Sequence, residues 1–586
     1  TYIKCNKPFE RLWISSMTDT AIKEGFEKLK DGSKYDNLYL SAKCRSEADW
    51  LVGINATRAY TTTNNILLSI GRVQTPTLAL IVERQKEIDN FVPKDYYELV
   101  TDYGEFKGTW FEDKPSQTKI FDKIKANLLM EKIKGKEGIV NKINKKKKNE
   151  QPPLLYDLTE LQRDGNKNYG YTAKNVLSIA QELYEKKKLI TYPRTDSRYL
   201  SDDMKALVKD TMKKINISPY NKAIEPIIEK GDLKFTKRII DNKKVTDHHA
   251  IIPTNVVPKT NNLSKDELNI YNLIVKRFIA VFYEKHIFET TEIITIVENE
   301  SFVSKGKVIK QEGWKSLYKS TSKDKTELLP QLKKGDKVTV YNVETLKKKT
   351  SPPKPYTEAT LLSAMENAGR FVEEEELKEQ LKESGFGTPA TRAGIIERLI
   401  QVEYIKRKGK SIYPTEKGTK LIEIIPSELK SPITTGKWER CLNKISKGNM
   451  DTEKFMNSIK RFTLYLVKQS QQSKGKVTFT QKETLNKKGQ NLEKIKNNSL
   501  GCCPLCDEGY VLENSKAYYC SQWRSGCKFS VWKNTLDIYN KQLDDKMIKE
   551  LLIHKKIEDI EVVFPKTNAK RILTLKLTEK GKLILV

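Results

Sequence analysis

A tyrosine between lysines and arginines is the first place where residue types and spacing suggest chemistry. Tyr192 stands in residues 189–197, after three lysines and before Arg194 and Arg198. Pro193 disfavours helical geometry at the preceding residue, so we expect Tyr192 to lie in extended backbone. A phenol has a pKa of about 10, so a nucleophilic tyrosine needs cationic neighbours, and Arg194 could also stabilise the charge of a phosphoryl group. The alternative is a packing role, which we expect of most of the 26 tyrosines.

Two of the four histidines, His248 and His249, are adjacent within residues 247–254. Adjacent side chains point in different directions on a strand or a helix, so they cannot easily share one site. We expect one of them to contact a phosphate while the other caps or packs. His286 and His554 belong to no such pattern.

Four cysteines near the C-terminus have the pattern of a metal module: Cys503, Cys506, Cys520 and Cys527. Zn²⁺ prefers tetrahedral sulfur ligands, which predicts a zinc ribbon whose folding depends on the metal. The gap between the last two cysteines is wider than the usual two residues, and Cys502 is an alternative ligand to Cys503. A redox pair or unmetallated thiols are the other interpretations. Aromatic residues beside lysines in this module suit single-stranded nucleic acid or the packing of the ribbon itself.

The composition favours a polyanionic partner. The 586 residues include 107 lysines and arginines against 76 aspartates and glutamates, a net charge of +31. Such an excess most simply indicates nucleic acid, and a lysine-rich proteome is the alternative explanation. No stretch is apolar for long enough to predict a membrane span. A chain of this length predicts about three to five domains.

Hydrophobic periodicity predicts how the chain is organised. Alternation in period two indicates sheet at residues 95–145 and again at 286–345, whereas residues 155–285 have helical spacing. We therefore expect one β domain interrupted by a helical insertion. Residues 357–465 are predicted helical, and within them a helix and a hairpin turning near Gly409 resemble a winged-helix unit. Residues 11–15 have the pattern of a buried strand.

Two lysine runs mark the predicted junctions between sheet and helices. The first lysine run (residues 145–148) precedes a proline pair at 152–153, and the second lysine run (residues 347–349) precedes a proline pair at 352–353. Proline ends regular structure, so each run closes a strand region. Such a run is more often a solvated face than a DNA site, and both interpretations stay open here.

Taken together, the motifs resemble those of type IA DNA topoisomerases. The residues around Tyr192 and His248 are closer to topoisomerase III than to topoisomerase I. The tyrosine run (residues 189–197) and the histidine run (residues 247–254) match the active-site pattern of that family. Further matching segments, in family order, are residues 46–58, 69–77, 155–162, 353–361 and 385–391. The resemblance covers about residues 10–420, and the terminal ribbon fits it as well.

The resemblance implies a multidomain α+β fold: a toroid with a β-rich arch, helical, winged-helix-like DNA-binding domains and a C-terminal zinc ribbon. The expected domains are a remnant of the Toprim domain (1–30), a helical DNA-binding domain (31–77 and 351–470), the arch (78–153 and 286–350), a helical domain with the nucleophilic tyrosine (154–285), a linker (471–500) and the zinc-ribbon region (501–586).

The resemblance also implies residue roles. Tyr192 would attack a phosphodiester to form a 5′-phosphotyrosine link, a second strand would pass, and the break would be resealed without ATP. Arg194 and His248 would hold the scissile phosphate. The residues expected to contact flanking DNA are Trp50, Arg58, Ser69, Ile70, Gly71, Arg72, Val73, Gln74, His249 and Thr388.

One departure from the family is visible. Its N-terminal module binds Mg²⁺ through acidic residues spaced Asp-x-Asp-x-Glu, and that spacing does not occur here. We therefore expect the magnesium ligands to be absent from this chain, with Mg²⁺ required by the intact enzyme and Zn²⁺ structural. The alternative function is a DNA-binding fragment or inert relative that cannot complete the cycle. A relaxase is disfavoured, because those enzymes need His-hydrophobe-His to bind metal.

The expected partners are single-stranded and negatively supercoiled DNA, with a helicase as a further candidate and no membrane. The expected state is a monomer in the bacterial cytoplasm, at the nucleoid or a plasmid. The expected tasks are relaxation of negative supercoils and decatenation.

Overall fold

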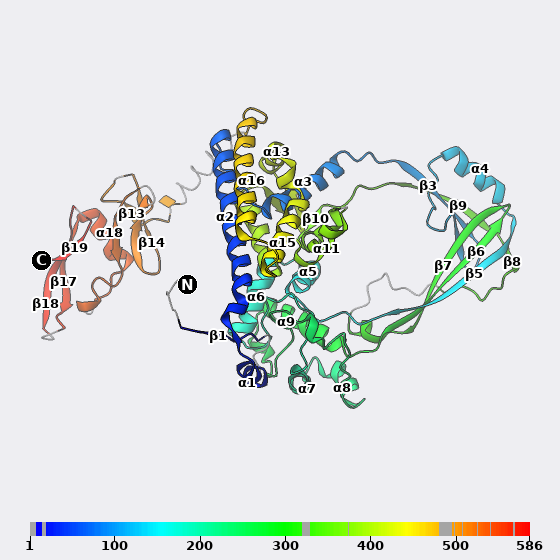
Figure 1. Ribbon diagram of the computed structural model, residues 1–586, viewed down its shortest axis with the longest axis horizontal. Helices are drawn as coiled ribbons and strands as arrows, with labels where there is room; N and C mark the ends of the chain where they lie inside the picture. Colours follow the sequence, from blue (N-terminus) through cyan, green and yellow to red (C-terminus); the bar gives the residue numbers. More distant parts are fainter. Residues whose placement is uncertain are drawn as a thin grey trace. The chain divides into compact units, whose positions relative to one another are not determined.

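The computed structural model describes residues 7–14, 19–318, 328–372, 374–479, 495–496, 498–506, 508–523, 526–539, 541–565, 569–579 and 581–586. The chain forms two compact units, Thr1–Val477 and Thr478–Val586, and each is described by itself. Figure 1 labels the elements along the chain. In the described part, no helix is both long and apolar enough to cross a membrane.

The N-terminal elements are short. Strands β1 (Glu10–Arg11) and β2 (Lys30–Asp31) pair antiparallel, and helix α1 (Asp19–Glu27) lies between them in the chain. Both residues of β1 are exposed, and Trp13 is 51% exposed. The prediction of a buried strand is therefore wrong for residues 11–14, and residue 15 lies outside the described residues. Leu12 and Ile14 are only half-buried, against the short helix α1.

The main sheet has seven strands in the order β8-β5-β6-β7-β4-β3-β9. Their bounds are β3 (Asp95–Asp102), β4 (Lys107–Trp110), β5 (Glu137–Glu150), β6 (His286–Val297), β7 (Glu300–Gln311), β8 (Lys337–Thr339) and β9 (Asn342–Lys349). All pairings are antiparallel. Helix α4 (Lys123–Ile133) covers one face, where Leu99, Trp110 and Phe302 are buried. Two stretches of chain thus build one sheet, and residues 151–285 are inserted between them.

Two strand pairs connect this sheet to the helices. At one junction Glu150 at the end of β5 pairs with His286 at the start of β6. The indole of Trp314, in the short helix η4 (Gly313–Leu317), donates to the carbonyl of Glu150 at 3.1 Å. At the other junction Asp95 of β3 pairs with Lys349 of β9. The first junction leads into residues 151–285, and the second joins α3 to β10.

The inserted segment packs around its own core. Its helices are α5 (Leu158–Tyr169), α6 (Ala173–Glu185), α7 (Met204–Lys214), α8 (Asn221–Ile228) and α9 (Lys265–Ala280). Apolar residues at helical spacing, such as Val176, Ala180 and Leu183 of α6, are fully buried in that core. Ser264 and Glu267 form a capping box that begins α9.

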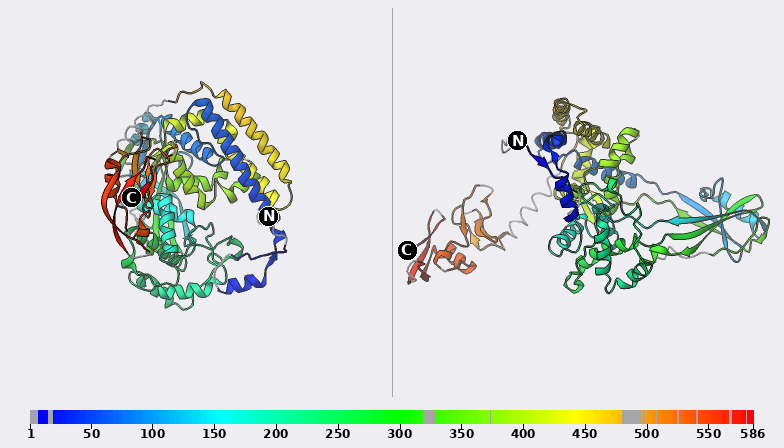
Figure 2. Two further views of the ribbon diagram at one scale, coloured as in Figure 1. Left: turned by 90° about the vertical axis from the view of Figure 1, so that its left-hand side faces the viewer. Right: turned by 60° about the horizontal axis from the view of Figure 1, so that its bottom comes forward.

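The remaining helices of this unit precede or follow the strands of the main sheet in the sequence. They are α2 (Asp36–Asn64), α3 (Gln74–Asp89), α10 (Glu358–Glu366), α11 (Glu375–Ser384), α12 (Pro389–Gln401), α13 (Glu416–Ile424), α14 (Ser427–Lys430), α15 (Pro432–Ser446) and α16 (Thr452–Gln472). The long helices α2 and α16 lie side by side (Figures 1 and 2). Strands β10 (Tyr356–Thr357), β11 (Ile405–Lys408) and β12 (Ser411–Pro414) form a small sheet. Helix α12 followed by the β11–β12 hairpin, which turns at Gly409 with φ +60°, has a winged-helix-like order.

The second unit contains two small sheets and one helix that share a core. Strands β13 (Gly501–Cys502), β14 (Tyr510–Glu513), β15 (Ala517–Cys520) and β16 (Ser530–Trp532) pair in chain order. Helix α18 (Asp545–His554) precedes β17 (Lys556–Val563), β18 (Lys570–Leu577) and β19 (Leu583–Leu585). Val511, Leu551 and Leu575 belong to one buried cluster that joins both sheets and the helix.

Candidate active site

Backbone pairing brings the tyrosine run and the histidine run together. Ile190 forms an antiparallel bridge with Pro253. Next to it, the amide of Thr191 donates to the carbonyl of Ile252 at 2.9 Å, and the amide of Ile252 donates to the Thr191 hydroxyl at 3.0 Å. The two runs are about 60 residues apart in sequence and face each other here over several residues.

This pairing places Tyr192 beside His248. Their ring centroids are 4.4 Å apart with 52° between the ring planes, and the ring of Tyr184 lies 5.5 Å from Tyr192 on an edge contact. Tyr192 lies outside any helix, as expected of a residue before proline. Its side chain is half-buried. Thr195 donates its hydroxyl to the carbonyl of His248 at 3.0 Å, which fixes the second run against the first.

The cations near Tyr192 differ in their availability. Arg194 is exposed, and within the described residues no hydrogen bond or ion pair engages its guanidinium. Arg198, in contrast, donates from Nε to Oδ2 of Asp157 at 2.6 Å and lies 3.2 Å from a carboxylate oxygen of Glu160. Of the two arginines that the sequence places after Tyr192, only Arg194 is therefore open to an anion.

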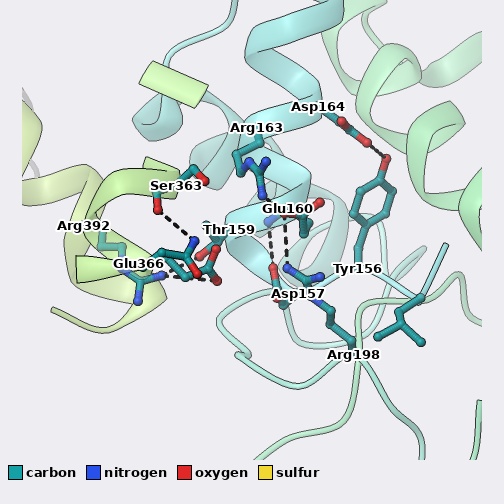
Figure 3. A network of polar contacts seen from close by, with 12 residues as sticks. Tyr156, Asp157, Thr159, Glu160, Arg163, Asp164, Arg198, Ser363, Glu366 and Arg392 are labelled. Carbon is teal, nitrogen blue, oxygen red and sulfur yellow. Dashed lines mark hydrogen bonds and ion pairs between the residues drawn. The ribbon is translucent and has the colours of Figure 1, made fainter. Parts of the chain in front are cut away.

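Asp157 attaches the tyrosine run to helix α5 (Figure 3). It is 3% exposed and accepts from the amide of Glu160 at 2.7 Å, so it caps α5 while it also holds Arg198. Burial raises the pKa of Asp157, and the charge of Arg198 opposes that shift. The amide of Leu158 donates to the carbonyl of Thr195 at 3.0 Å, a second link between the two segments.

Arg392 on α12 extends this network, and the sequence did not single it out. Its side chain is 5% exposed, and Nη1 donates to the hydroxyl of Thr159 at 2.9 Å and lies 3.9 Å from a carboxylate oxygen of Glu366. Burial lowers the pKa of Arg392, whereas burial and then the charge of Asp157 raise the pKa of Glu366 (Figure 3). The sequence feature that could have identified Arg392 is its position on the apolar side of α12, beside the buried Ala393 and Ile396.

Several residues predicted to contact DNA are accessible. Trp50 is 64% exposed and Arg58 is exposed, both on α2. Ser69, Gly71, Val73 and Gln74 are half-buried around the start of α3. Thr388 is exposed at the beginning of α12.

Three of the predicted DNA contacts are buried or already engaged. Ile70 is 4% exposed, and its amide donates to the Thr57 hydroxyl at 2.9 Å. Nδ1 of His249 lies 2.9 Å from the carbonyl oxygen of Ala250, which can accept a hydrogen bond from the ring N–H, and burial lowers the pKa of this imidazole.

Arg72, the third, is 8% exposed and forms ion pairs with Asp49 at 2.6 Å and Glu439 at 2.8 Å. Its guanidinium also lies 5.2 Å from the ring centre of Trp438. Burial alone would raise the pKa of Glu439, but Arg45 and Arg72 hold it below its ordinary value. The geometry gives Arg72 a role in joining α2 to α15 and does not support direct contact between its side chain and DNA.

The four cysteines of the second unit converge. Their sulfur atoms all lie within 4.8 Å of one another, with Cys503 and Cys527 3.8 Å apart and Cys506 and Cys520 3.6 Å apart. A zinc–sulfur bond of about 2.3 Å sets the sulfurs of a tetrahedron about 3.8 Å apart, so this donor set could hold zinc. Cys502 is exposed on β13 and outside the cluster, which decides between it and Cys503.

The acidic side chains of the described residues form no comparable cluster. Within the described residues, the cysteine cluster is the sole group of three or more metal-ligating side chains close enough to share an ion. The carboxylates of Asp157, Glu160 and Glu366 are occupied by arginines instead.

Comparison with known proteins places these features in a family. A family model described as DNA topoisomerase matches residues 33–457, which contain both the tyrosine run and the histidine run. The chain belongs to this DNA topoisomerase family. It is 44% identical over 481 residues to "DNA topoisomerase 3" of Bacillus licheniformis, which covers 81% of this chain and 66% of that protein. It is also 44% identical to the protein of that name from Bacillus subtilis, over 80% of this chain and 65% of the relative.

The topoisomerase chain thus spans slightly less than two thirds of the length of these relatives. Among solved structures, it is similar to full-length topoisomerase I from Thermotoga maritima, with a TM-score of 0.59 and 24% identity over 78% of this chain and 72% of that one. That likeness shows the fold alone. The predicted membership of the type IA topoisomerases of the topoisomerase III kind is confirmed, and so is the predicted α+β fold class.

Proposed function

We propose that this topoisomerase chain cleaves one strand of DNA through Tyr192, allows a strand to pass and reseals the break without ATP. The observation that carries this proposal is the pairing of the tyrosine and histidine runs, with the rings of Tyr192 and His248 4.4 Å apart. Family membership supports it, because 44% identical relatives bear the name DNA topoisomerase 3.

In the proposed cleavage step, the phenolic oxygen of Tyr192 forms a bond to the phosphorus of a phosphodiester. The bond from phosphorus to the 3′ oxygen breaks, the phenol loses its proton and the 3′ oxygen gains one. The product is a 5′-phosphotyrosine link and a free 3′-hydroxyl, which reverses the step when it attacks the same phosphorus. The energy of the phosphodiester is retained in the link, so no ATP is needed.

Arg194 and His248 are proposed to hold the scissile phosphate. Arg194 is exposed and unengaged within the described residues, so its planar guanidinium could pair with two phosphate oxygens. His248 reaches the same place because its ring lies against that of Tyr192. His249 is half-buried, and its lowered pKa favours a neutral ring that supports the loop.

The flanking DNA is proposed to lie along exposed and half-buried residues of the helical part. These are Trp50, Arg58, Ser69, Gly71, Val73, Gln74 and Thr388. Ile70 and Arg72 would support that surface from beneath, since their side chains are buried.

The cysteine cluster is proposed to bind structural Zn²⁺, which would stabilise the second unit. Magnesium is proposed for the whole enzyme, with ligands outside those described here. The proposed partners are single-stranded and negatively supercoiled DNA, with a helicase as a further candidate. The proposed setting is a monomer at chromosomal or plasmid DNA in the bacterial cytoplasm, active in relaxation and decatenation.

A second candidate function is DNA binding without a completed cleavage cycle. It is favoured by one observation: the described residues offer no carboxylate cluster that could hold magnesium.

Covalent trapping separates the two candidates. A single-stranded oligonucleotide, labelled on the 3′ side so that the label stays with the 5′-phosphotyrosine, is incubated with the chain and quenched with detergent. The same is done with Tyr192→Phe and with Tyr184→Phe, a matched control whose ring lies 5.5 Å from Tyr192. We expect labelled protein with the parent and with Tyr184→Phe, and none with Tyr192→Phe.

An adduct that survives in Tyr192→Phe would refute Tyr192 as the nucleophile. No adduct in any of the three, with equal DNA binding, would favour the second candidate. The N-terminal segment of a Bacillus relative, added with Mg²⁺, would then show whether cleavage can be restored.

A further inference from the structure

The two lysine runs look alike in the sequence and differ in the structure. Each ends a long strand at a junction between the sheet and the helices: the first lysine run closes β5, and the second closes β9. Each has a partner strand along its whole length, β6 for the first and β3 for the second. The difference lies in what those partner strands carry.

The second lysine run is neutralised. Lys347 lies 2.9 Å and Lys349 3.7 Å from the carboxylate of Asp95, and Lys348 lies 2.5 Å from that of Glu98. All three ammonium groups are therefore paired with acids of β3, which leaves little net charge on this strand pair.

The first lysine run has no such partners. Lys145, Lys146 and Lys148 face Thr291, Thr290 and Phe288 across the β5–β6 ladder. Lys147 faces Glu289, yet within the described residues none of the four lysines forms an ion pair. All four are exposed.

The neighbouring strand increases the same charge. Strand β7 pairs with β6 on its other side and contributes Lys305 and Lys310, and residues 301–311 contain no acid. Over residues 142–150, 286–294 and 303–311, this ribbon has eight lysines and three glutamates. Figure 1 shows β5, β6 and β7 running together along their length.

The spacing of these charges suits a nucleic-acid backbone. Lysines at alternate positions of a strand lie about 6.8 Å apart on one face, which matches every second phosphate, whereas consecutive lysines point to opposite faces. One strand of duplex DNA carries a phosphate per about 3.4 Å of axis. A flexible ammonium group on a long stem can follow such a row without a fixed geometry.

We infer that the β5–β6–β7 ribbon is a docking surface for the phosphate backbone of duplex DNA, and that the β3–β9 pair is not. This surface lies outside residues 154–285, so it would hold a DNA segment other than the strand bound at Tyr192. The inference rests on the proposed function only in taking DNA as the polyanion, and it names where a passing duplex is held during strand passage.

Two triple variants with the same change in net charge test the inference. Lys145→Gln, Lys146→Gln and Lys148→Gln are combined in one full-length chain, and Lys347→Gln, Lys348→Gln and Lys349→Gln in the matched control. Binding of a fluorescent blunt-ended hairpin duplex is measured by anisotropy at several salt concentrations, and thermal unfolding confirms that both variants fold.

For the first variant we expect weaker duplex binding, by about tenfold at low salt, and a salt slope reduced by roughly 0.9 for each phosphate that the variant no longer neutralises. We expect the control to bind like the parent. Equal duplex affinity and salt slope in the parent and the first variant would overturn the inference. An equal decrease in both variants would also overturn it, because it would show a response to net charge alone.

The adduct formed at Tyr192 with a single-stranded oligonucleotide serves as an independent readout. It should be unchanged in the first variant, and disappearance of the adduct together with duplex binding would refute a separate surface. If no chain forms an adduct, the proposed function fails while the duplex measurement still decides the inference.

Discussion

The guanidinium of Arg198 donates to the carboxylate of Asp157 at 2.6 Å, across 41 residues of sequence. This contact joins the segment that carries Tyr192 to the first turn of α5, since Asp157 is also the cap of that helix. The position of the tyrosine run therefore depends on a buried carboxylate that accepts from Arg198 and from the amide of Glu160.

Asp157→Ala is expected to lower the free energy of unfolding by about 3 kcal/mol. The variant loses a helix cap, worth about 1 kcal/mol, and leaves a largely buried guanidinium without its closest partner. The measurement is the midpoint of urea unfolding followed by tryptophan fluorescence. Asp451→Ala is the matched control, because Asp451 caps α16 and forms no ion pair among the described residues; it should cost only about 1 kcal/mol. Equal destabilisation in the two variants would show that the pair with Arg198 contributes nothing.

Much of the candidate site could be predicted from sequence because its residues are contiguous. Tyr192 and Arg194 fall in one run and His248 in another, and the proline after Tyr192 disfavours a helix at that residue, where the structure has none. The four cysteines could be identified as a set by spacing. The choice of Cys503 over Cys502 as a ligand needed the structure, in which Cys502 of β13 is exposed and outside the cluster.

The parts that sequence could not supply depend on contacts between distant residues. Arg72 matches a DNA-contact segment, but Glu439 lies 367 positions away and draws its guanidinium into a buried ion pair. The two lysine runs are indistinguishable in sequence, and only the strand register shows that Asp95 and Glu98 neutralise one of them. Arg392 is hidden in a helical pattern whose neighbours are apolar.

The stability of wild type relative to Glu366→Gln is expected to fall as pH rises. Burial, and then the charge of Asp157, raise the pKa of Glu366 above its ordinary value of 4.5. A raised pKa means that the folded chain holds this proton more tightly than the unfolded chain does. The stabilising contribution is therefore complete below pH 4.5 and is lost as pH rises through the folded pKa. Glutamine cannot ionise, so the variant should gain on wild type above pH 4.5.

Thermal unfolding of both proteins between pH 4.5 and 8 measures this difference in melting temperature. A difference that stays constant over the range would contradict the raised pKa. A difference that reverses sign, with the variant less stable at pH 8, would mean that the contact with Arg392 at 3.9 Å outweighs the cost of the buried charge.

Removal of zinc is expected to unfold the second unit and leave the first intact. The strands around the four cysteines are short, and part of their core is formed by Cys503 and Cys520 themselves, so the bound metal supplies folding energy. Purified chain should contain one zinc per molecule, measured by plasma mass spectrometry, and a chelator should make residues 498–586 sensitive to protease. Cys506→Ser should lose the metal, whereas Cys502→Ser should retain it. Zinc retained in Cys506→Ser would contradict the assigned ligand set.

The last prediction concerns the starts of α6 and α10, where backbone amides donate to side chains of other helices. The carboxylate of Glu358, the first residue of α10, accepts from the amide of Ala173 at the start of α6 at 2.6 Å. The side chain of Asn166, on the neighbouring helix α5, accepts from the amide of Ala359 in α10 at 3.2 Å. Glu358 is 3% exposed, so its bond to Ala173 is shielded from water. These contacts dock the segment that carries Tyr192 onto α10.

Glu358→Gln is expected to loosen that docking. A hydrogen bond to a charged group contributes about 1.5–3 kcal/mol, so the amide of Ala173 should exchange with deuterium roughly 10- to 100-fold faster in the variant. Exchange is read by mass spectrometry on peptides covering the start of α6. Glu416→Gln is the matched control, because Glu416 is likewise the first residue of its helix, α13, but is exposed and pairs with Lys420 of the same helix. Faster exchange at Ala173 in both variants, or in neither, would show that Glu358 does not hold the two segments together.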